Sequence, residues 1–230
     1  MSGPRPAIRE LLRNVSIFAH LGAAELADLE RLVELREVAA DGLVVGQEEP
    51  GDALYVLARG RCKVVLYGES GREIILRVFK KPGDFFGEMS LLDGEPRSAT
   101  VIAMEASQLL RLSREAFGQH LRSSSATALA VMAELSRRLR EADGVIGNLA
   151  LLDVYGRLAR TLRQLAHSDG EESADGVVIR DLPTQQELAG LMGTSRETVS
   201  RAFAELSRRG LVRLTGRRLL LRRDFLADHG

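Results

Sequence analysis

The feature that most constrains the fold is a regular apolar repeat in the second half of the chain. Apolar residues recur there at alternating steps of four and three, the spacing of a helix face that packs against another helix. They are Ala128, Met132, Leu135, Leu139, Ala142, Ile146 and Leu149. Such a repeat predicts a long helix paired with the same helix of a second copy, although packing against the chain's own β domain is the alternative. We therefore expect a homodimer.

A different pattern precedes this helix. From about Asp41 the apolar period falls to two, as in strands with one buried face. Two runs show it clearly: Cys62, Val64 and Leu66, then Ile74, Leu76 and Val78. Glycines punctuate the same region at short intervals, at Gly42, Gly46, Gly51, Gly60, Gly83, Gly87 and Gly94. This combination of alternating apolar residues and closely spaced glycines predicts short antiparallel strands closed into a barrel or roll over about residues 20 to 112.

Length and charge set the class of protein. A chain of 230 residues can form two domains, each with its own core. Lysine plus arginine equals aspartate plus glutamate at 32 each, so the net charge indicates no partner. Arginines are nevertheless unevenly placed, because nine lie between Arg196 and Arg223 against only Glu197 and Glu205. A polyanion is therefore a candidate partner for that end.

Several classes are disfavoured by what the sequence lacks. No signal peptide and no apolar run of bilayer length are recognisable, so we expect a cytoplasmic protein without membrane contact. A lone Cys62 cannot form an intrachain disulfide, and four scattered histidines show no metal-ligand spacing. No nucleophile with a base, no phosphate-binding loop and no paired catalytic carboxylates are recognisable, so we expect neither catalysis nor a metal site.

A boundary follows the long helix. The segment from Asn148 to Asp153 is expected to end it, with Asp153 capping a new helix from Val154 to Ala166. The acidic stretch at residues 168–176 is interpreted as an exposed loop, either a solvated connector or a contact surface for another protein. RNA polymerase is a further candidate partner of the protein.

The last third contains a helix-turn-helix pattern. Thr184 and Glu187 form a capping box that starts one helix, which Gly193 and Thr194 end. Residues 195–206 form the second helix. Its apolar face is Val199, Ala202, Phe203 and Leu206, and its opposite face is Arg196, Glu197, Ser200 and Arg201. The first face is expected to anchor the helix, which leaves the second free.

The free face suits recognition of double-stranded DNA. Arginine can donate two hydrogen bonds to guanine, and glutamate can accept from cytosine. Residues 210–214 and 218–221 add a two-stranded wing whose arginines can hold phosphates. Alternatively, Glu197 closes a second capping box with Thr194, and Arg196 and Arg201 are merely solvated.

A family resemblance adds to this reading. Residues 195–201, Ser-Arg-Glu-Thr-Val-Ser-Arg, resemble the recognition helix of the cyclic-AMP receptor protein and fumarate-nitrate regulator (CRP/FNR) family of bacterial transcription regulators. The hinge at residues 147–154 and the glycine-rich roll are similar as well. The resemblance implies that Arg196, Glu197 and Arg201 read a TGTGA-type half-site.

Residues 82–100 resemble that family's cyclic-nucleotide phosphate cassette. The resemblance implies that Arg97 and Ser98 hold a phosphate and that Gly87 and Glu88 contact a sugar. The chemistry agrees, because arginine neutralises phosphate and a glutamate can accept from a ribose hydroxyl. The alternative is a Gly-Glu turn with an edge-strand arginine paired to an acid.

The sequence does not identify which nucleotide base would be bound. In the cyclic-AMP receptor a Thr-Ser pair touches adenine, and aligning the hinge places Ala142 and Asp143 at those positions. Ala142 has no hydroxyl, whereas Asp143 could accept from adenine or guanine. We rank cyclic AMP first, then cyclic GMP or cyclic di-GMP, then no ligand. A haem-based gas or redox sensor is a rival, with candidate iron ligands His20, Cys62, His120 and His167.

The expected fold is α+β with three parts. Residues 1–123 form a cyclic-nucleotide-binding-like β-roll with flanking helices, residues 124–152 form the dimerisation helix and hinge, and residues 153–230 form a winged helix-turn-helix domain that binds DNA.

Overall fold

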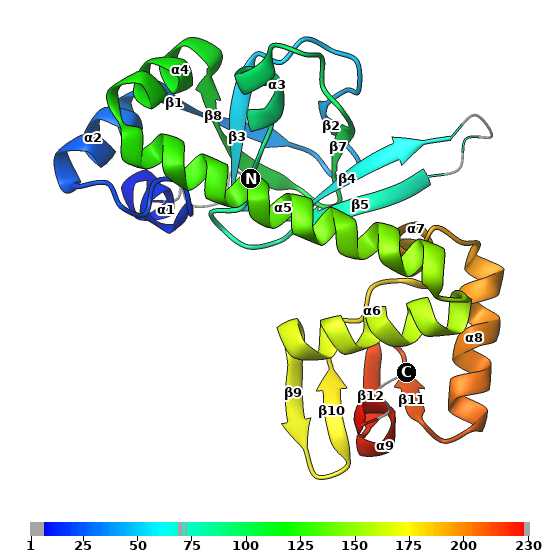
Figure 1. Ribbon diagram of the computed structural model, residues 1–230. Helices are drawn as coiled ribbons and strands as arrows, with labels where there is room; N and C mark the ends of the chain where they lie inside the picture. Colours follow the sequence, from blue (N-terminus) through cyan, green and yellow to red (C-terminus); the bar gives the residue numbers. More distant parts are fainter. Residues whose placement is uncertain (1–6, 69–70, 72, 228–230) are drawn as a thin grey trace. The chain divides into compact units, whose positions relative to one another are not determined.

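The computed structural model of the protein contains two compact units (Figure 1). It describes residues 7–68, 71 and 73–227. One unit comprises the residues up to Leu66 together with Leu76–Arg140, and the other comprises Tyr67–Ile75 together with the residues from Glu141 onward. Each unit has its own hydrophobic core. The architecture is α+β, with a β-roll, a long helix and a winged helix-turn-helix.

The first unit is built around the β-roll. Helices α1 (Ile8–Asn14) and α2 (Ala23–Leu32) precede it, α3 (Glu88–Asp93) lies within it, and α4 (Arg114–Ser123) follows it. Its strands are β1 (Val33–Val38), β2 (Leu43–Val45), β3 (Ala53–Arg59), β4 (Cys62–Tyr67), β5 (Glu73–Phe79), β6 (Phe85–Phe86), β7 (Thr100–Ala103) and β8 (Ser107–Ser113). The predicted series of short strands is confirmed.

Two four-stranded sheets form the roll. One has the strand order β1-β8-β3-β6 and the other β2-β7-β4-β5. Strand β3 is buried on both faces, because Tyr55 and Leu57 pack into the core between the sheets while Leu54 and Val56 pack against α1, α2 and α4. The helices therefore cover the outer face of the first sheet. Its inner face packs against the second sheet and so closes the roll.

The long helix expected from the apolar repeat is α5 (Ser125–Leu151). It ends where the sequence predicts a break, and α6 (Val154–Asp169) begins after Asp153. The Asp153 carboxylate caps α6 by accepting a hydrogen bond of 2.8 Å from the backbone N–H of Gly156. The predicted cap is confirmed, and α6 runs three residues beyond its expected end.

The second unit packs helices against a small sheet. After α6 come β9 (Gly170–Ser173), β10 (Gly176–Ile179), α7 (Gln185–Met192), α8 (Arg196–Arg208), β11 (Val212–Thr215), β12 (Arg218–Arg222) and α9 (Arg223–Ala227). The sheet order is β11-β12-β10-β9. Buried residues of α6, α7, α8 and β12 share one core, with Leu158, Leu188, Phe203 and Leu219 among them. This core fixes α7 and α8 relative to each other.

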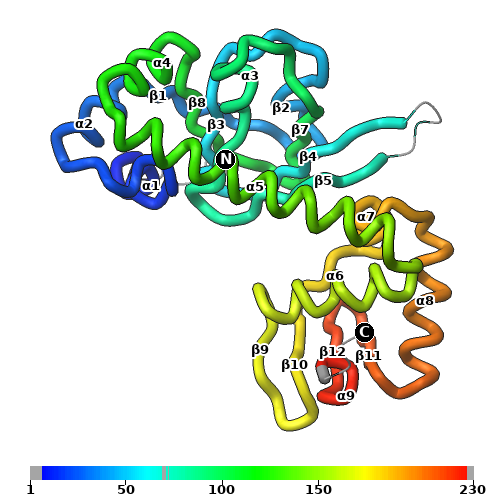
Figure 2. The backbone as a smooth tube through the Cα atoms, viewed as in Figure 1, coloured from blue at the N-terminus to red at the C-terminus, as the bar shows by residue number. Residues whose placement is uncertain are grey.

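The acidic stretch at residues 168–176 is not a loop, which corrects the expectation from sequence. Strand β9 pairs with β10 in an antiparallel hairpin, with Ser173 opposite Gly176 (yellow in Figure 2). Glu171 and Glu172 remain exposed on this edge strand. Backbone pairing with the buried strand β10 needs no apolar side chains on β9, so the polar composition did not indicate a strand.

Candidate functional site

Two caps position α7 and α8 for the helix-turn-helix. Thr184 caps α7 in the predicted capping box, in which Glu187 N–H donates to Thr184 Oγ1 at 3.2 Å and Thr184 N–H donates to the Glu187 carboxylate at 2.6 Å. Gly193 ends α7 with φ of 61°, a left-handed conformation that glycine adopts without steric cost. Ser195 then caps α8 by accepting from Thr198 N–H.

The alternative capping box of Thr194 with Glu197 is wrong. The backbone N–H of Thr194 donates to Ala189 O at 2.9 Å, so Thr194 completes the end of α7 while the next residue, Ser195, caps α8. Helix α8 consequently begins at Arg196 and extends to Arg208, two residues beyond the expected end.

The two faces of α8 differ in burial as the spacing predicts. The anchoring residues, Val199, Ala202, Phe203 and Leu206, are buried in the core of the second unit. The residues assigned to the free face, Arg196, Glu197, Ser200 and Arg201, are all exposed. They lie in the first two turns of the helix. The buried face fixes the helix, and the exposed face presents two guanidinium groups, a hydroxyl and a carboxylate.

Glu197 is available as a charged acceptor. Hydrogen bonds from its own backbone N–H and from the Ser195 hydroxyl hold its pKa below the ordinary value, and the charges of Arg196 and Arg201 act in the same direction. The carboxylate is therefore ionised at neutral pH, as acceptance from a cytosine amino group requires.

Part of the arginine excess around α8 is neutralised within the unit. Arg208 and Arg209 both pair with Glu205, and Arg217 pairs with Asp181 at 2.7 Å. The wing arginines, Arg213 on β11 and Arg218 and Arg222 on β12, are exposed. The predicted two-stranded wing is confirmed, with Thr215 opposite Arg218. Cationic side chains thus flank the exposed face of α8.

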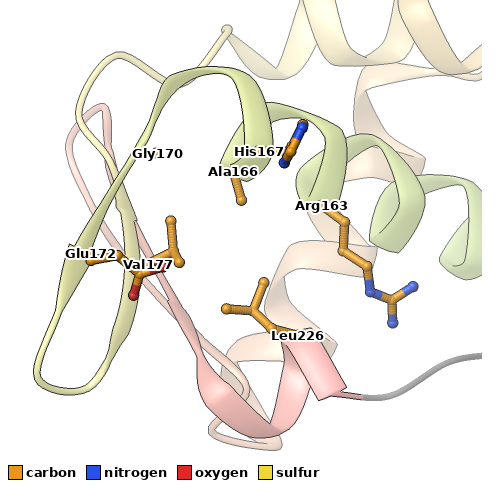
Figure 3. Close-up of a pocket in the computed structure, with 7 residues that line it drawn as sticks. All are labelled: Arg163, Ala166, His167, Gly170, Glu172, Val177 and Leu226. Carbon is orange, nitrogen blue, oxygen red and sulfur yellow. The ribbon is translucent and has the colours of Figure 1, made fainter.

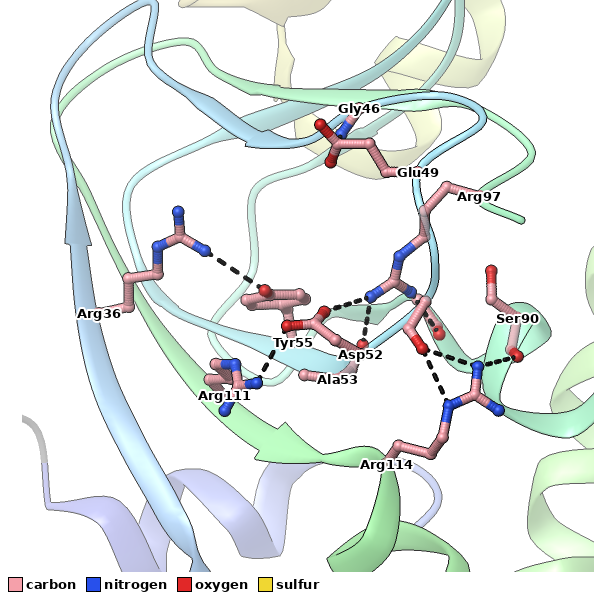
Figure 4. A network of polar contacts seen from close by, with 12 residues as sticks. Arg36, Gly46, Glu49, Asp52, Ala53, Tyr55, Ser90, Arg97, Arg111 and Arg114 are labelled. Atoms are coloured by element: carbon pink, nitrogen blue, oxygen red, sulfur yellow. Dashed lines mark hydrogen bonds and ion pairs between the residues drawn. The ribbon is translucent and has the colours of Figure 1, made fainter. Parts of the chain in front are cut away.

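In the first unit, Arg97 is the centre of a dense polar network (Figure 4). Its side chain is only 4% exposed. Its Nη1 donates to Gly87 O at 2.8 Å, and its Nη2 donates to Ala53 O at 2.7 Å and to Asp52 Oδ1 at 3.1 Å. These contacts use three of the five guanidinium N–H groups. The predicted neighbours Gly87 and Arg97 are therefore brought together, with Ser98 next in sequence and exposed.

Asp52 is a residue that sequence reasoning missed. Its other oxygen accepts from Arg111 Nη2 at 2.9 Å, so one carboxylate joins two arginines (Figure 4). Burial works to raise the pKa of Asp52, but the hydrogen bond and charge of Arg111, with the charge of Arg97, hold it below the ordinary value. The pairing of Arg97 with an acid, left as an alternative by the sequence, is therefore present. It leaves Nε and one Nη1 hydrogen of Arg97 for other partners.

Glu88 has a partner that sequence reasoning also missed. Its side chain is 2% exposed, and its Oε1 accepts from Arg138 Nη1 of α5 at 2.9 Å. Arg138 also donates to Phe85 O and to Glu134, one turn earlier on α5. Among the described residues, the buried Oε2 of Glu88 has no hydrogen-bond partner. The signal for Arg138 was its position one turn before Ala142.

Ala142 and Asp143 do not belong to the same unit as this cluster. Both are exposed on α5 and belong to the second unit, whereas Gly87, Glu88, Arg97 and Ser98 belong to the first. The four cassette residues therefore all lie in one unit, in which Arg97 contacts Gly87 directly.

The apolar repeat on α5 is largely exposed. Met132, Leu139, Ile146 and Leu149 are each at least half exposed, and Leu139 reaches 64%. Leu135 is different, because it packs partly against the core of the β-roll. The alternative of packing on the chain's own β domain thus holds for this one position. Leu129 is also exposed and was missed, because it lies one residue outside the regular spacing.

The candidate haem ligands do not form a common site. Cys62 is buried in the roll, and burial raises the pKa of its thiol to about 11. His20 and His120 meet at Thr127, and His167 lies on α6. Within the described residues, no group of three or more His, Cys, Asp and Glu side chains could hold a metal ion. No helix in the described part of the chain is long and apolar enough to cross a membrane.

A cavity of about 330 Å³ lies in the second unit, between α6, the β9–β10 hairpin and α9 (Figure 3). Arg163 is on its wall, where the Nε donates to Phe225 O at 3.3 Å and the guanidinium lies 5.2 Å from the Phe225 ring centre. None of the residues assigned to DNA or nucleotide binding lines it.

Comparison with known families gives two matches in separate parts of the chain. Residues 35–124 match the cyclic nucleotide-binding domain, and residues 156–228 match the Crp-like helix-turn-helix domain. The first range contains Asp52, Glu88 and Arg97, and the second contains α7, α8 and the wing.

Individual relatives cover nearly the whole chain. The CRP-like cAMP-activated global transcriptional regulator of Mycobacterium tuberculosis is 31% identical over 212 residues, which is 92% of this chain and 94% of the relative. The cAMP-activated global transcriptional regulator CRP of Escherichia coli is 34% identical over 180 residues, 77% and 84% of the two chains. Among solved structures, the c-di-GMP responsive global regulator CLP of Xanthomonas campestris has a TM-score of 0.74 at 27% identity, covering 87% of this chain and 99% of that one.

Proposed function

Because this chain belongs to the CRP/FNR family of transcription regulators, a family without enzymatic activity, we propose that it acts as a homodimer that reads TGTGA-like half-sites under the control of a cyclic nucleotide. The observation that carries the DNA-reading part is the pattern of burial on α8. Arg196, Glu197 and Arg201 are exposed in its first two turns, while the opposite face is locked in the core. Helices of this kind enter the major groove with their N-terminal residues.

A dimer explains both the exposed stripe on α5 and the expected operator. Pairing two α5 helices would cover Met132, Leu139 and Ile146, which a single chain leaves in water. Two-fold symmetry then implies a near-palindromic site with half-sites about one helical turn apart. In this proposal residues 1–123 bind nucleotide, residues 124–152 dimerise and residues 153–230 bind DNA.

The DNA contacts are tested with Arg196→Ala. We expect it to bind a TGTGA palindrome more weakly by about 1–3 kcal/mol and to lose its preference for that site over one with the contacted guanine replaced. Fluorescence anisotropy at one fixed salt concentration measures both quantities.

The matched control is Arg180→Ala, because Arg180 is an exposed arginine of the same unit that pairs with Glu171 on the β9–β10 hairpin. The control should keep the wild-type preference. If Arg196→Ala still discriminates the guanine position, direct readout by Arg196 is wrong.

Nucleotide control is supported by the match of residues 35–124 and by the geometry around Glu88. The buried Oε2 of Glu88 lacks a partner among the described residues, so it is suited to accept from a ligand hydroxyl. Arg97 is held by Gly87, Ala53 and Asp52, and its Nε and one Nη1 hydrogen remain available to bind a phosphate.

Cyclic AMP is the first candidate effector. Two curated relatives are named as cAMP-activated regulators, which favours it. Asp143, a carboxylate, could accept from adenine N6 or from guanine N1 and N2, and Ala142 supplies no hydroxyl. The CLP regulator is described as responsive to c-di-GMP, so cyclic di-GMP and cyclic GMP rank second and a ligand-free regulator third.

Ser98→Ala tests the phosphate position without disturbing the core, because Ser98 is exposed and Arg97 is not. We expect calorimetric titration of the wild type with cyclic AMP, cyclic GMP and cyclic di-GMP to show binding of one of them. Ser98→Ala should weaken that binding about tenfold or more, as expected for loss of a hydrogen bond to a charged group. Ser16→Ala, another exposed serine of the same unit, should bind as the wild type does.

Two results would count against nucleotide control. One is the absence of binding heat for all three nucleotides. The other is equal affinity of the wild type for its DNA with and without the bound nucleotide, since a ligand shifts only an equilibrium whose states it binds unequally.

A further inference from the structure

Two histidines meet at the start of α5, outside the sites described above. Nε2 of His120, on α4, lies 3.0 Å from Oγ1 of Thr127. Nε2 of His20, in the connection between α1 and α2, lies 3.1 Å from the same oxygen. Thr127 is fully buried in the first turn of α5. The α1–α2 connection, α4 and α5 are thus joined through one hydroxyl group, and His20 is 107 residues from Thr127 in the sequence.

The hydrogen bonds around Thr127 indicate which ring nitrogen of each histidine carries a hydrogen. The Thr127 hydroxyl donates its single hydrogen to Ser124 Oγ at 3.0 Å, so Oγ1 can only accept from the two imidazoles. A hydroxyl oxygen has two lone pairs, and the two Nε2–H groups fill them. In the closed cluster each ring therefore carries a hydrogen on Nε2.

Positive charge is disfavoured at this position. Ser124 Oγ accepts from Thr127 N–H and so caps α5, whose first turn carries the positive end of the helix dipole. The rings of Phe18 and His120 pack in a T-shaped arrangement, with 5.7 Å between ring centres. Burial lowers the pKa of His120, Glu25 of α2 acts in the opposite direction, and His20 lowers it further. The native state therefore favours a neutral His120.

We propose that His20, His120 and Thr127 form a pH-sensitive latch, which holds the start of α5 against α4 and the α1–α2 connection while His120 is neutral and loosens when His120 is protonated. The latch acts on the helix that carries the exposed apolar stripe. It needs neither the nucleotide site nor the DNA site proposed above, so it stands or falls independently of them.

The direction of the pH effect follows from proton binding. Histidine has an ordinary pKa of 6.5, and the pKa of His120 in the folded protein lies below it. As the pH falls below about 6.5, the opened state takes up a proton that the closed state does not. The closed latch is thus fully favoured above this range and is progressively lost as the pH falls through it.

Hydrogen exchange on the full-length chain tests the latch. We expect amide protection in residues 125–131, corrected for intrinsic exchange, to fall between pH 7.5 and 5.5, by up to about tenfold per pH unit for each proton taken up. EDTA is present throughout, so that bound metal does not contribute. Unchanged wild-type protection across this range would overturn the proposal.

The double variant His20→Gln/His120→Gln places an amide N–H near each donor position and cannot titrate. We expect its protection at residues 125–131 to be independent of pH over the same range. His167→Gln, which removes a histidine of α6 in the other unit, should retain the wild-type dependence. Retention of that dependence by the double variant would also overturn the proposal.

A second measurement does not depend on whether the variants fold. Titration of the ring protons of His120 in the wild-type protein by NMR should give a midpoint below 6.5. A midpoint at or above this value would show that the closed latch does not disfavour protonation, and the proposal would be wrong.

Discussion

At the scale of single residues, Gly87 has a backbone role besides the sugar contact that the family resemblance implies. It precedes α3 with φ of 90°, in the left-handed region. A Cβ at this position would lie 2.6 Å from Arg97 Nη1 and 3.0 Å from Ala53 O. Glycine therefore serves two needs, an unusual backbone conformation and close approach of a buried guanidinium. Both place Arg97 beside the backbone of α3.

Gly87→Ala should consequently destabilise the protein. We expect the free energy of unfolding, measured with urea, to fall by about 1–3 kcal/mol, because the backbone conformation is strained for alanine and Arg97 must shift. The matched control is Gly118→Ala within α4, where the new Cβ meets only the flexible end of Arg122. That substitution should stabilise by up to about 1 kcal/mol through helix propensity. Equal effects of the two substitutions would contradict the argument.

At the scale of elements, sequence patterns predicted helices and strands best where one face is buried and the chain ends are capped. The capping box at Thr184 and the cap at Asp153 were confirmed because a cap depends on contacts three residues away. The choice of Ser195 over Thr194 was not predictable in the same way. It depends on how the end of α7 folds back, which involves Gly193 and Ala189.

For strands, the sequence did not predict which face is buried. The alternation in β4 predicted a strand but not its buried face, because Cys62 and Val65 are buried while Val64 is only partly covered. Strand β3 has no alternation, since it separates two cores. Strand β9 has no apolar face at all, since it is held at the sheet edge by its pairing with β10. Burial of a strand face is set by its neighbours, which the local sequence does not contain.

At the scale of the whole molecule, the exposed stripe on α5 is the main indication of a second copy. Leu129, Met132, Leu139 and Ile146 are all more than half exposed on one helix. Exposed apolar residues in such a row mark an interaction surface. Leu135 narrows the stripe, because it already packs against the β-roll of its own chain.

Leu139→Lys tests the dimer. We expect it to shift the protein from dimer to monomer in sedimentation velocity at micromolar concentration, because pairing would bury two ammonium groups in an apolar seam. The free energy of unfolding of the monomer should change little, since Leu139 is 64% exposed within one chain. Leu43→Lys is the matched control, an exposed leucine on β2 of the roll, and should remain dimeric. A wild-type monomer, or a dimeric Leu139→Lys variant, would contradict the proposed interface.

The sequence by itself determined the caps of α6 and α7, the helix-turn-helix and the two faces of α8, because each depends on residues within one or two turns of one another. Only the tertiary structure decided which side chains surround the candidate nucleotide site. Asp52 reaches Arg97 across 45 residues, and Arg138 reaches Glu88 across 50. The meeting of His20 and His120 at Thr127 is likewise a product of packing. Such partners are chosen by the approach of segments distant in sequence, and no local spacing encodes that approach.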